Sequence, residues 1–408
     1  MERNWAYVAL INFLVAAIMG LTLRMVYLVE APGLDFRHLM HAHSHVAMLG
    51  WCYLILYYLI WVNFIPQGKK EAPVYQRLFW LTQASVLGMA LSFPFQGYGP
   101  VSIGFTALHL ICSYYFFILV WRDLAGRQAS ASGLLLRTAL VWMLLSTVGV
   151  WALGPITVQG GRGSALYYMA IQFFLHFQFN GWFTFAALAL LFQWLERRGV
   201  TFSTGHFRIF FGLLVASCML TYALSVTWST PMQVLFYLNG LGVVLQIGAI
   251  GYFLWLLWPT IGSLSQEMGQ PGMRWLLGMA LVSFLAKVLV QSMVIIPQVA
   301  VISYTIRQFV IGFIHLTMLG SISLFVLAML WKELSGKVNN TGVYLLLAGF
   351  LGSELLLFGQ GLLLWMGLGF VPYYYELIFA FSALIPIGIL LILREIKSSL
   401  RGYNHLIT

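Results

Sequence analysis

A cluster of histidines near the N-terminus has the clearest capacity for chemistry in this sequence. His38, His41, His43 and His45 fall within eight positions, at the start of an apolar run that continues to Phe64. Imidazole is the side chain that most often binds metals in proteins. Histidine is uncommon inside a membrane span, where it indicates a functional site by default. The cluster therefore predicts a bound metal or haem.

Helical spacing divides this cluster into two sets. His41 and His45 are four residues apart and share one face of a helix, whereas His43 points to nearly the opposite side. One helix would then serve two sites, with His38 as the outer flank. If the helix begins after His41, the first histidines would instead lie in a loop.

The composition is that of an integral membrane protein. Hydrophobic residues make up 61% of the chain and charged residues 8%, with a mean hydropathy of +0.89, whereas soluble domains average about 25% charged residues. The net charge of +10 would suggest nucleic acid for a soluble protein. Here we expect a lipid bilayer as the partner and no nucleic acid. Single cysteines without a Cys-x-x-Cys motif indicate neither covalent haem attachment nor a zinc knuckle.

Apolar runs of about 20 residues or more can cross a bilayer as helices. The sequence contains twelve such runs and no convincing internal repeat, which predicts an all-α protein with a single transmembrane domain over residues 1–408. The first run is too long for a signal peptide and is expected to remain as a span. The predicted spans are 5–28, 41–64, 76–97, 100–121, 133–154, 166–195, 206–228, 231–258, 272–296, 301–331, 341–368 and 374–396.

The distribution of positive charge predicts the orientation. Most of the 21 Lys and Arg lie at the two ends of the chain or in loops after even-numbered spans. Cytoplasmic loops carry such an excess, so both termini are expected in the cytoplasm, for a multi-pass protein of the inner cell membrane. The opposite side has only Arg24, Arg37, Arg162 and Arg307.

Three further histidines lie in spans that run in the same direction as the second. They are His109, His176 and His315, in the fourth, sixth and tenth spans. Their depths predict that histidines of four helices meet in the outer half of the membrane. For His109 alone, a structural hydrogen bond to a neighbouring helix is the alternative.

Twelve spans with histidine on the second, sixth and tenth resemble subunit I of the haem-copper oxidase superfamily. The segment 42–48 is similar to the one that supplies an axial ligand of a low-spin haem, with His43 in the ligand position. The segment 313–320 is similar to the tenth span of the family, with His315 in the low-spin position. The resemblance therefore implies a haem b held between His43 and His315. Phe313 occupies the high-spin position and cannot ligate iron.

The chain also departs from this family. His176 after an aromatic pair looks like the copper ligand of the sixth span, but Asn180 stands where many oxidases have a tyrosine. The paired histidines of the seventh span are missing from 207–228. The resemblance thus leaves enzyme activity open. A different second site, for copper or another transition metal, could use His41, His45, His109 and His176, since imidazole suits several metals.

Several polar residues could support these sites. Haem propionates need cationic partners, and arginine suits carboxylates; the outer candidates are Arg37, Arg162 and Arg307. Charged residues inside spans indicate proton or ion paths, or buried pairs. The two cases are Lys287 with Gln291 and Glu354 with Gln360.

Three functions follow from these observations. The first is a redox hemoprotein in electron transfer or in oxygen or nitric oxide chemistry, for which the resemblance implies a cytochrome or quinol donor and companion subunits. The second is a non-catalytic haem or copper protein of nitric oxide stress or metal handling, since the His-Ala-His run is also similar to the NnrS family. The third is a secondary transporter with histidine and Glu354 as coupling groups.

Overall fold

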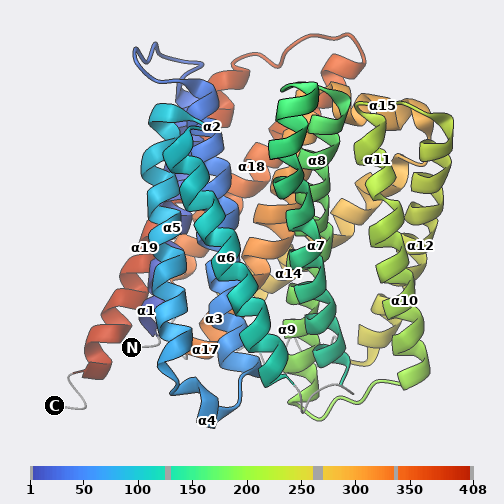
Figure 1. The fold of residues 1–408 in the computed structure, drawn as a ribbon. Helices are drawn as coiled ribbons and strands as arrows, with labels where there is room; N and C mark the ends of the chain where they lie inside the picture. The colour runs from blue at the N-terminus through green and yellow to red at the C-terminus, as the bar shows by residue number, and fades with distance from the viewer. Residues whose placement is uncertain (1–2, 125–129, 261–269, 335–338, 405–408) are drawn as a thin grey trace. The chain divides into compact units, whose positions relative to one another are not determined.

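The computed structural model describes residues 3–124, 130–260, 270–334 and 339–404, and their regular structure is entirely helical (Figure 1). Within these described residues, twelve helical stretches are long and apolar enough to cross a membrane, which confirms the predicted number and the membrane class. They are Asn4–Met25, Phe36–Phe64, Pro73–Gln96, Pro100–Asp123, Ala131–Gly160, Ala165–Glu196, Thr204–Thr227, Gln233–Thr260, Pro271–Met293, Arg307–Glu333, Asn340–Trp365 and Tyr374–Ile396.

The chain forms two compact units. Unit 1 comprises Met1–Asp123, Met268–Leu281 and Met318–Thr408, and unit 2 comprises Leu124–Glu267 and Val282–Thr317. The ninth and tenth spans each contribute residues to both units. The single domain expected from the sequence stays a prediction.

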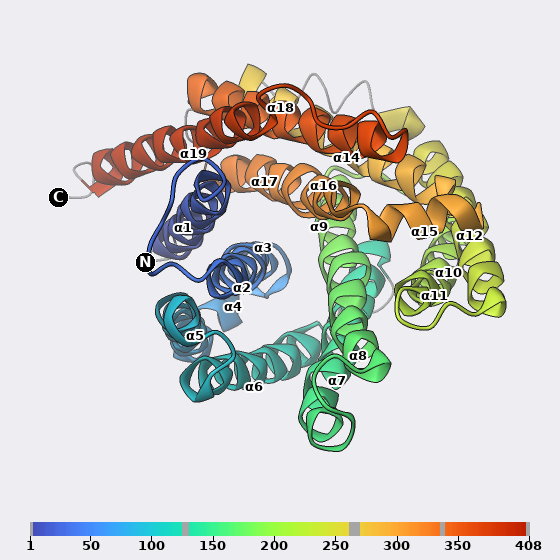
Figure 2. The same ribbon diagram turned by 90° about the horizontal axis from the view of Figure 1, so that it is seen from above.

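Unit 1 contains the histidine cluster. Its second span consists of three helical segments in direct succession, and α1 packs against all three of them. Figure 2 shows α1 beside α19 and α5 beside α6. The helices of unit 1 are α1 (Arg3–Met25), α2 (Phe36–His45), η1 (Val46–Cys52), α3 (Tyr53–Phe64), α4 (Gln67–Lys70), α5 (Pro73–Gln96), α6 (Pro100–Asp123), α17 (Leu324–Leu334), α18 (Asn340–Trp365) and α19 (Tyr374–Asn404).

Unit 2 is built around α7, which packs against α8 and α9, and around the pair α10 and α12 (Figure 2). Its helices are α7 (Ala131–Gly160), α8 (Ala165–His176), η3 (Phe177–Phe183), α9 (Thr184–Glu196), α10 (Thr204–Leu220), α11 (Tyr222–Thr227), α12 (Gln233–Leu257), η4 (Trp258–Thr260), α15 (Pro297–Thr305) and α16 (Arg307–His315). The helices shared between the units are α14 (Pro271–Met293) and η5 (Leu316–Ser323).

Two predicted helix starts differ from the structure by five residues or more, and local chemistry explains both. The second span begins at Phe36 and not at residue 41, because Asp35 caps its N-terminus by accepting a hydrogen bond from the His38 backbone N–H. All four clustered histidines are therefore helical. The tenth span begins at Arg307 and not at residue 301, because Ile306 is extended (φ −89°, ψ 110°) and separates it from α15.

Three spans contain a π-helical segment, and each segment begins directly after a histidine. These segments are η1 after His45, η3 after His176 and η5 after His315. π-Helical turns are rare in proteins overall, but those that occur are often located at functional sites. The extra residue displaces backbone carbonyls from their usual partners, and side chains satisfy some of them. Asn12 donates to the Gly50 carbonyl at 3.0 Å, and Thr184 donates to the Phe179 carbonyl at 2.7 Å.

A glycine five residues after the histidine lets two of these π segments pack closely. A Cβ on Gly50 would lie 2.7 Å from a methyl carbon of Val86, and one on Gly181 would lie 2.7 Å from the Cβ of Trp142. Neither contact is compatible with a larger residue, so the widened helices pack against their neighbours through backbone.

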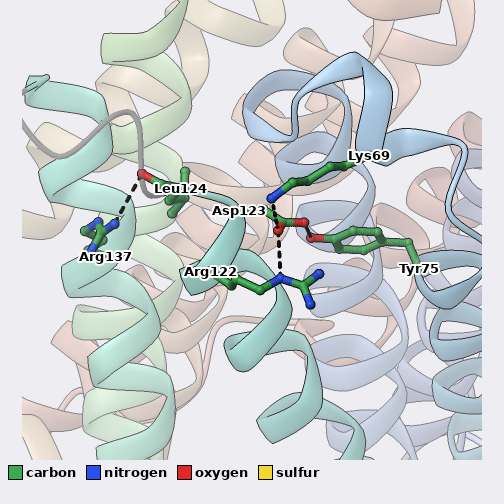
Figure 3. Close-up of polar contacts among 6 residues, drawn as sticks. All are labelled: Lys69, Tyr75, Arg122, Asp123, Leu124 and Arg137. Carbon is green, nitrogen blue, oxygen red and sulfur yellow. Dashed lines mark hydrogen bonds and ion pairs between the residues drawn. The ribbon is translucent and has the colours of Figure 1, made fainter.

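A buried carboxylate stabilises the end of α6 in unit 1 (Figure 3). The side chain of Asp123 is fully buried and forms ion pairs with Lys69 at 2.7 Å and Arg122 at 3.0 Å. The Tyr75 hydroxyl donates to its other oxygen at 2.8 Å. These contacts join α6 to α4 and α5. In unit 2, Arg137 donates to the Leu124 carbonyl at 3.2 Å (Figure 3).

The first prediction concerns this carboxylate. Asp123→Ala should lower the free energy of unfolding by about 1–3 kcal/mol, because Tyr75 and two partly exposed cations lose a charged acceptor. The measurement is thermal unfolding of the purified protein in detergent. Glu376→Ala, at an exposed acid of unit 1, is the control and should leave the midpoint unchanged. An equal midpoint for both variants would contradict a stabilising role for Asp123.

Candidate histidine sites

His43 contacts the first span. Its Nδ1 lies 2.8 Å from the Ala16 carbonyl oxygen. The ring also lies against the backbone of Gly20, where a Cβ would come within 2.9 Å of the His43 Cε1. His43 thus faces α1.

His41 and His45 lie against Phe93 of the third span and Tyr98 just after it. His45 Nδ1 lies 2.9 Å from the His41 carbonyl oxygen, and the His45 ring stacks on Phe93 with centroids 4.3 Å apart. The His41 ring packs edge-on against Tyr98 at 4.7 Å. These contacts confirm that His41 and His45 share a face and that His43 points away from it.

The hydrogen bonds of His43 and His45 determine which ring nitrogen carries the proton. A backbone carbonyl can only accept, so each Nδ1 must be the N–H donor. The neutral ring then keeps its lone pair on Nε2. Metal-bound histidines commonly donate their second N–H to a carbonyl or carboxylate in this way. In both side chains the lone pair is therefore on Nε2, and the two rings lie on opposite faces of one helix.

His109 is the most deeply buried histidine of unit 1, at 1% exposure. Neither of its ring nitrogens has a hydrogen bond of ordinary geometry among the described residues, but the backbone of Leu49 lies close to the ring and interacts with it. The Tyr53 ring packs edge-on against it at 4.7 Å. A structural hydrogen bond to a neighbouring helix, here to the Leu49 backbone, stays the alternative role of His109.

His176 belongs to unit 2 and is bonded differently. Its Nε2 lies 2.8 Å from the Cys218 carbonyl oxygen, and its Nδ1 faces the Asn180 amide nitrogen at 3.4 Å. Both ring nitrogens are thus engaged within the protein. No group of three or more His, Cys, Asp or Glu residues of the described chain is arranged to hold a metal ion. The second metal site with His41, His45, His109 and His176 stays a prediction.

The remaining predicted residues lie at or between the spans. His315 is half-buried and ends α16, two residues after the half-buried Phe313. Arg37, Arg162 and Arg307 are exposed. The structure does not test their pairing with propionates.

The structure identifies a repeat that sequence reasoning missed. The pattern His-x-x-x-x-Gly starts each π-bearing segment, at His45–Gly50, His176–Gly181 and His315–Gly320. The three copies lie in the second, sixth and tenth spans, a period of four spans. His43 has no counterpart in the other copies, where Phe174 and Phe313 stand two residues before the histidine. A search for histidine at a fixed distance from glycine would have found this repeat.

Comparison with known proteins gives no identification: no protein-family model matches the chain, and no curated protein is significantly similar to it.

The second prediction concerns the helix that carries the cluster. The His38 backbone N–H donates to Asp35 and holds the pKa of this carboxyl below its usual range. A depressed folded-state pKa means that the cap stabilises the first turn above the unfolded pKa of about 4. This stabilisation is lost as the pH falls through the lower, folded value.

Asp35→Ala should therefore speed amide hydrogen exchange at His38 and the following residues near neutral pH. Asp35→Asn should keep the cap, because asparagine is an equally good N-cap residue, and should remove its acid dependence. Hydrogen exchange followed by mass spectrometry measures both effects. Equal protection of this turn in the wild type and Asp35→Ala would exclude the capping role.

Proposed function

We propose that this protein is a redox hemoprotein of the inner cell membrane that binds one low-spin haem b through His43 and His315. Both termini are placed in the cytoplasm, with the haem in the outer half of the membrane. The proposed activity is electron transfer, or oxygen or nitric oxide chemistry. A cytochrome or a quinol would donate the electrons, and companion subunits would belong to the complex.

The observation that carries this proposal is which nitrogen of the His43 ring bears the proton. Its N–H bond to the Ala16 carbonyl leaves Nε2 as the coordinating atom, which suits an axial haem ligand. The choice of His315 as the second ligand rests on the sequence resemblance and on its place before a π-helical segment. Bound haem would supply one-electron transfer. The protein's part is to hold the imidazole in one tautomer and one orientation.

The third prediction tests these ligands. His43→Ala and His315→Ala should each abolish the sharp reduced absorption spectrum of a bis-histidine haem b, because each removes one axial nitrogen. His38→Ala is the matched control, since it removes a histidine of the same helix that is not a proposed ligand. Absorption spectra of dithionite-reduced, purified variants provide the measurement. An unchanged spectrum in His43→Ala would eliminate this residue as a ligand.

We further propose that the opposite face of α2 holds a transition metal, with His45 and His109 as ligands and His41 beside them. A buried imidazole without a hydrogen-bond partner is costly, and His109 has two nitrogens in this state. The His45 Nδ1 donates to the His41 carbonyl, so the ring nitrogen that could bind the metal is Nε2. Copper suits such imidazole donors. This site favours a metal-handling or nitric oxide role alongside electron transfer.

The fourth prediction concerns this metal. His109→Leu should reduce bound copper to background while the haem spectrum remains, because the substitution removes a ligand and fills the same apolar space. Metal analysis of purified protein from copper-supplemented cells measures the loss. Tyr53→Phe, which keeps the packing against His109, should retain the copper. Absence of copper in the wild type would refute the copper assignment.

A further inference from the structure

Lys287 is a buried cation in the interior of unit 2. It lies in α14, is 2% exposed, and donates to the Asn180 side-chain oxygen at 2.6 Å. Among the described residues, no carboxylate forms an ion pair with its Nζ. Lys287 is also the only buried lysine among the residues that the structure describes.

The absence of a counter-ion makes a permanently charged Lys287 costly. An isolated ammonium in an apolar interior costs far more than a hydrogen-bonded neutral amine. The Asn180 oxygen accepts a hydrogen bond from either form and cannot neutralise the charge. Lys69, by contrast, is half-exposed and paired with a carboxylate. The surroundings of Lys287 thus suit an amine that gains and loses a proton.

A chain of hydrogen bonds holds Asn180 in the orientation that Lys287 needs. The Cys218 carbonyl can only accept, so His176 donates from Nε2 and its Nδ1 accepts from the Asn180 amide N–H. The Asn180 oxygen is then directed to Lys287. The other titratable groups that face this chain are the Cys218 thiol and the Tyr222 hydroxyl, and the latter donates to a backbone carbonyl. None of them is an acid that could pair with the ammonium.

Polar side chains continue from Lys287 toward the Met293 end of the span. Gln291 lies one turn further on the same face and accepts a hydrogen bond from Gln246 at 3.2 Å. Asn239 donates to the Val294 carbonyl at 3.1 Å, just past the helix end.

Two acceptors on this route are unused. The side-chain oxygens of Gln246 and Asn239 are buried and have no hydrogen-bond partner among the described residues. Buried polar atoms of this kind are uncommon in proteins and call for an explanation, such as a bound water. Along the helix axis, Lys287 is about 9 Å from the end of α14 at Met293. The side-chain amides of Gln291, Gln246 and Asn239 lie along this distance, up to the turn that follows the helix.

We propose that Lys287 is an exchangeable proton-binding site, reached from the Met293 end of α14 along Gln291, Gln246 and Asn239. The amine nitrogen takes one proton from water to become an ammonium and returns the same proton to water; no other bond changes. The site would accept or supply a proton for a reaction elsewhere in the protein. It does not depend on the proposed haem.

The test observes the Lys287 Nζ directly in the full-length protein reconstituted in lipid bilayers. Ala286–Lys287 is the only Ala-Lys pair in the sequence, so labelling alanine carbonyls with ¹³C and lysine uniformly with ¹³C and ¹⁵N selects the backbone nitrogen of this lysine in solid-state NMR. Transfer along its labelled side-chain carbons then reaches its Nζ. No substitution is needed for the assignment. The Nζ chemical shift separates amine from ammonium, and transfer to ²H₂O gives the rate of proton exchange.

We expect both forms of Lys287 across the pH range in which the protein stays folded. Gln246→Leu and Gln291→Leu should each slow exchange by about tenfold, the effect on a rate of losing one ordinary hydrogen bond. Gln178→Leu is the matched control, because Gln178 is also buried in unit 2 but bonds to Ser146 off the route; it should exchange at the wild-type rate.

Two results would overturn the proposal. One is a Lys287 that remains ammonium at every pH, which would make it a fixed charge. The other is unchanged exchange in both route variants, which would place the entry of protons elsewhere. If one route variant fails to fold, the other decides the second point.

Discussion

In an apolar membrane interior, a buried imidazole needs an acceptor for its N–H and a donor or a metal ion for the lone pair of its other nitrogen. This requirement connects the main features of the structure, because a polar group that bonds neither protein nor ligand there costs several kcal/mol. His43 and His45 satisfy the N–H with backbone carbonyls. His176 satisfies both nitrogens, and His109 satisfies neither among the described residues.

These differences separate ligand candidates from structural histidines. The lone pair of His43 and of His45 is on Nε2, and the two rings face different neighbours, so one helix can serve two sites. His176 instead orients Asn180, which accepts from Lys287. His176, which resembles an oxidase copper ligand, is therefore linked through Asn180 to a buried lysine in this chain.

The sequence predicted the span count because apolar runs of membrane length are strong signals. It also predicted the two faces of the histidine helix, because side-chain direction follows from helical geometry. It misplaced the start of that helix, since a single aspartate side chain sets the boundary. It did not predict the π segments, which depend on tertiary packing at Gly50 and Gly181. Partners such as Asn180 for Lys287 are distant in the chain and leave no local signal.

The three π segments give the histidine positions a common structural context. Each begins directly after a histidine, and a glycine lies five residues after that histidine, although the surrounding sequences differ. Widened turns bring backbone and side chains into arrangements that a regular helix does not allow.

The most direct test of the central claim is a pyridine haemochrome assay, combined with iron analysis, on wild-type protein purified from haem-replete cells. Our account predicts one haem b per chain, with a matching amount of iron. A colourless, iron-free preparation that is correctly folded would contradict it.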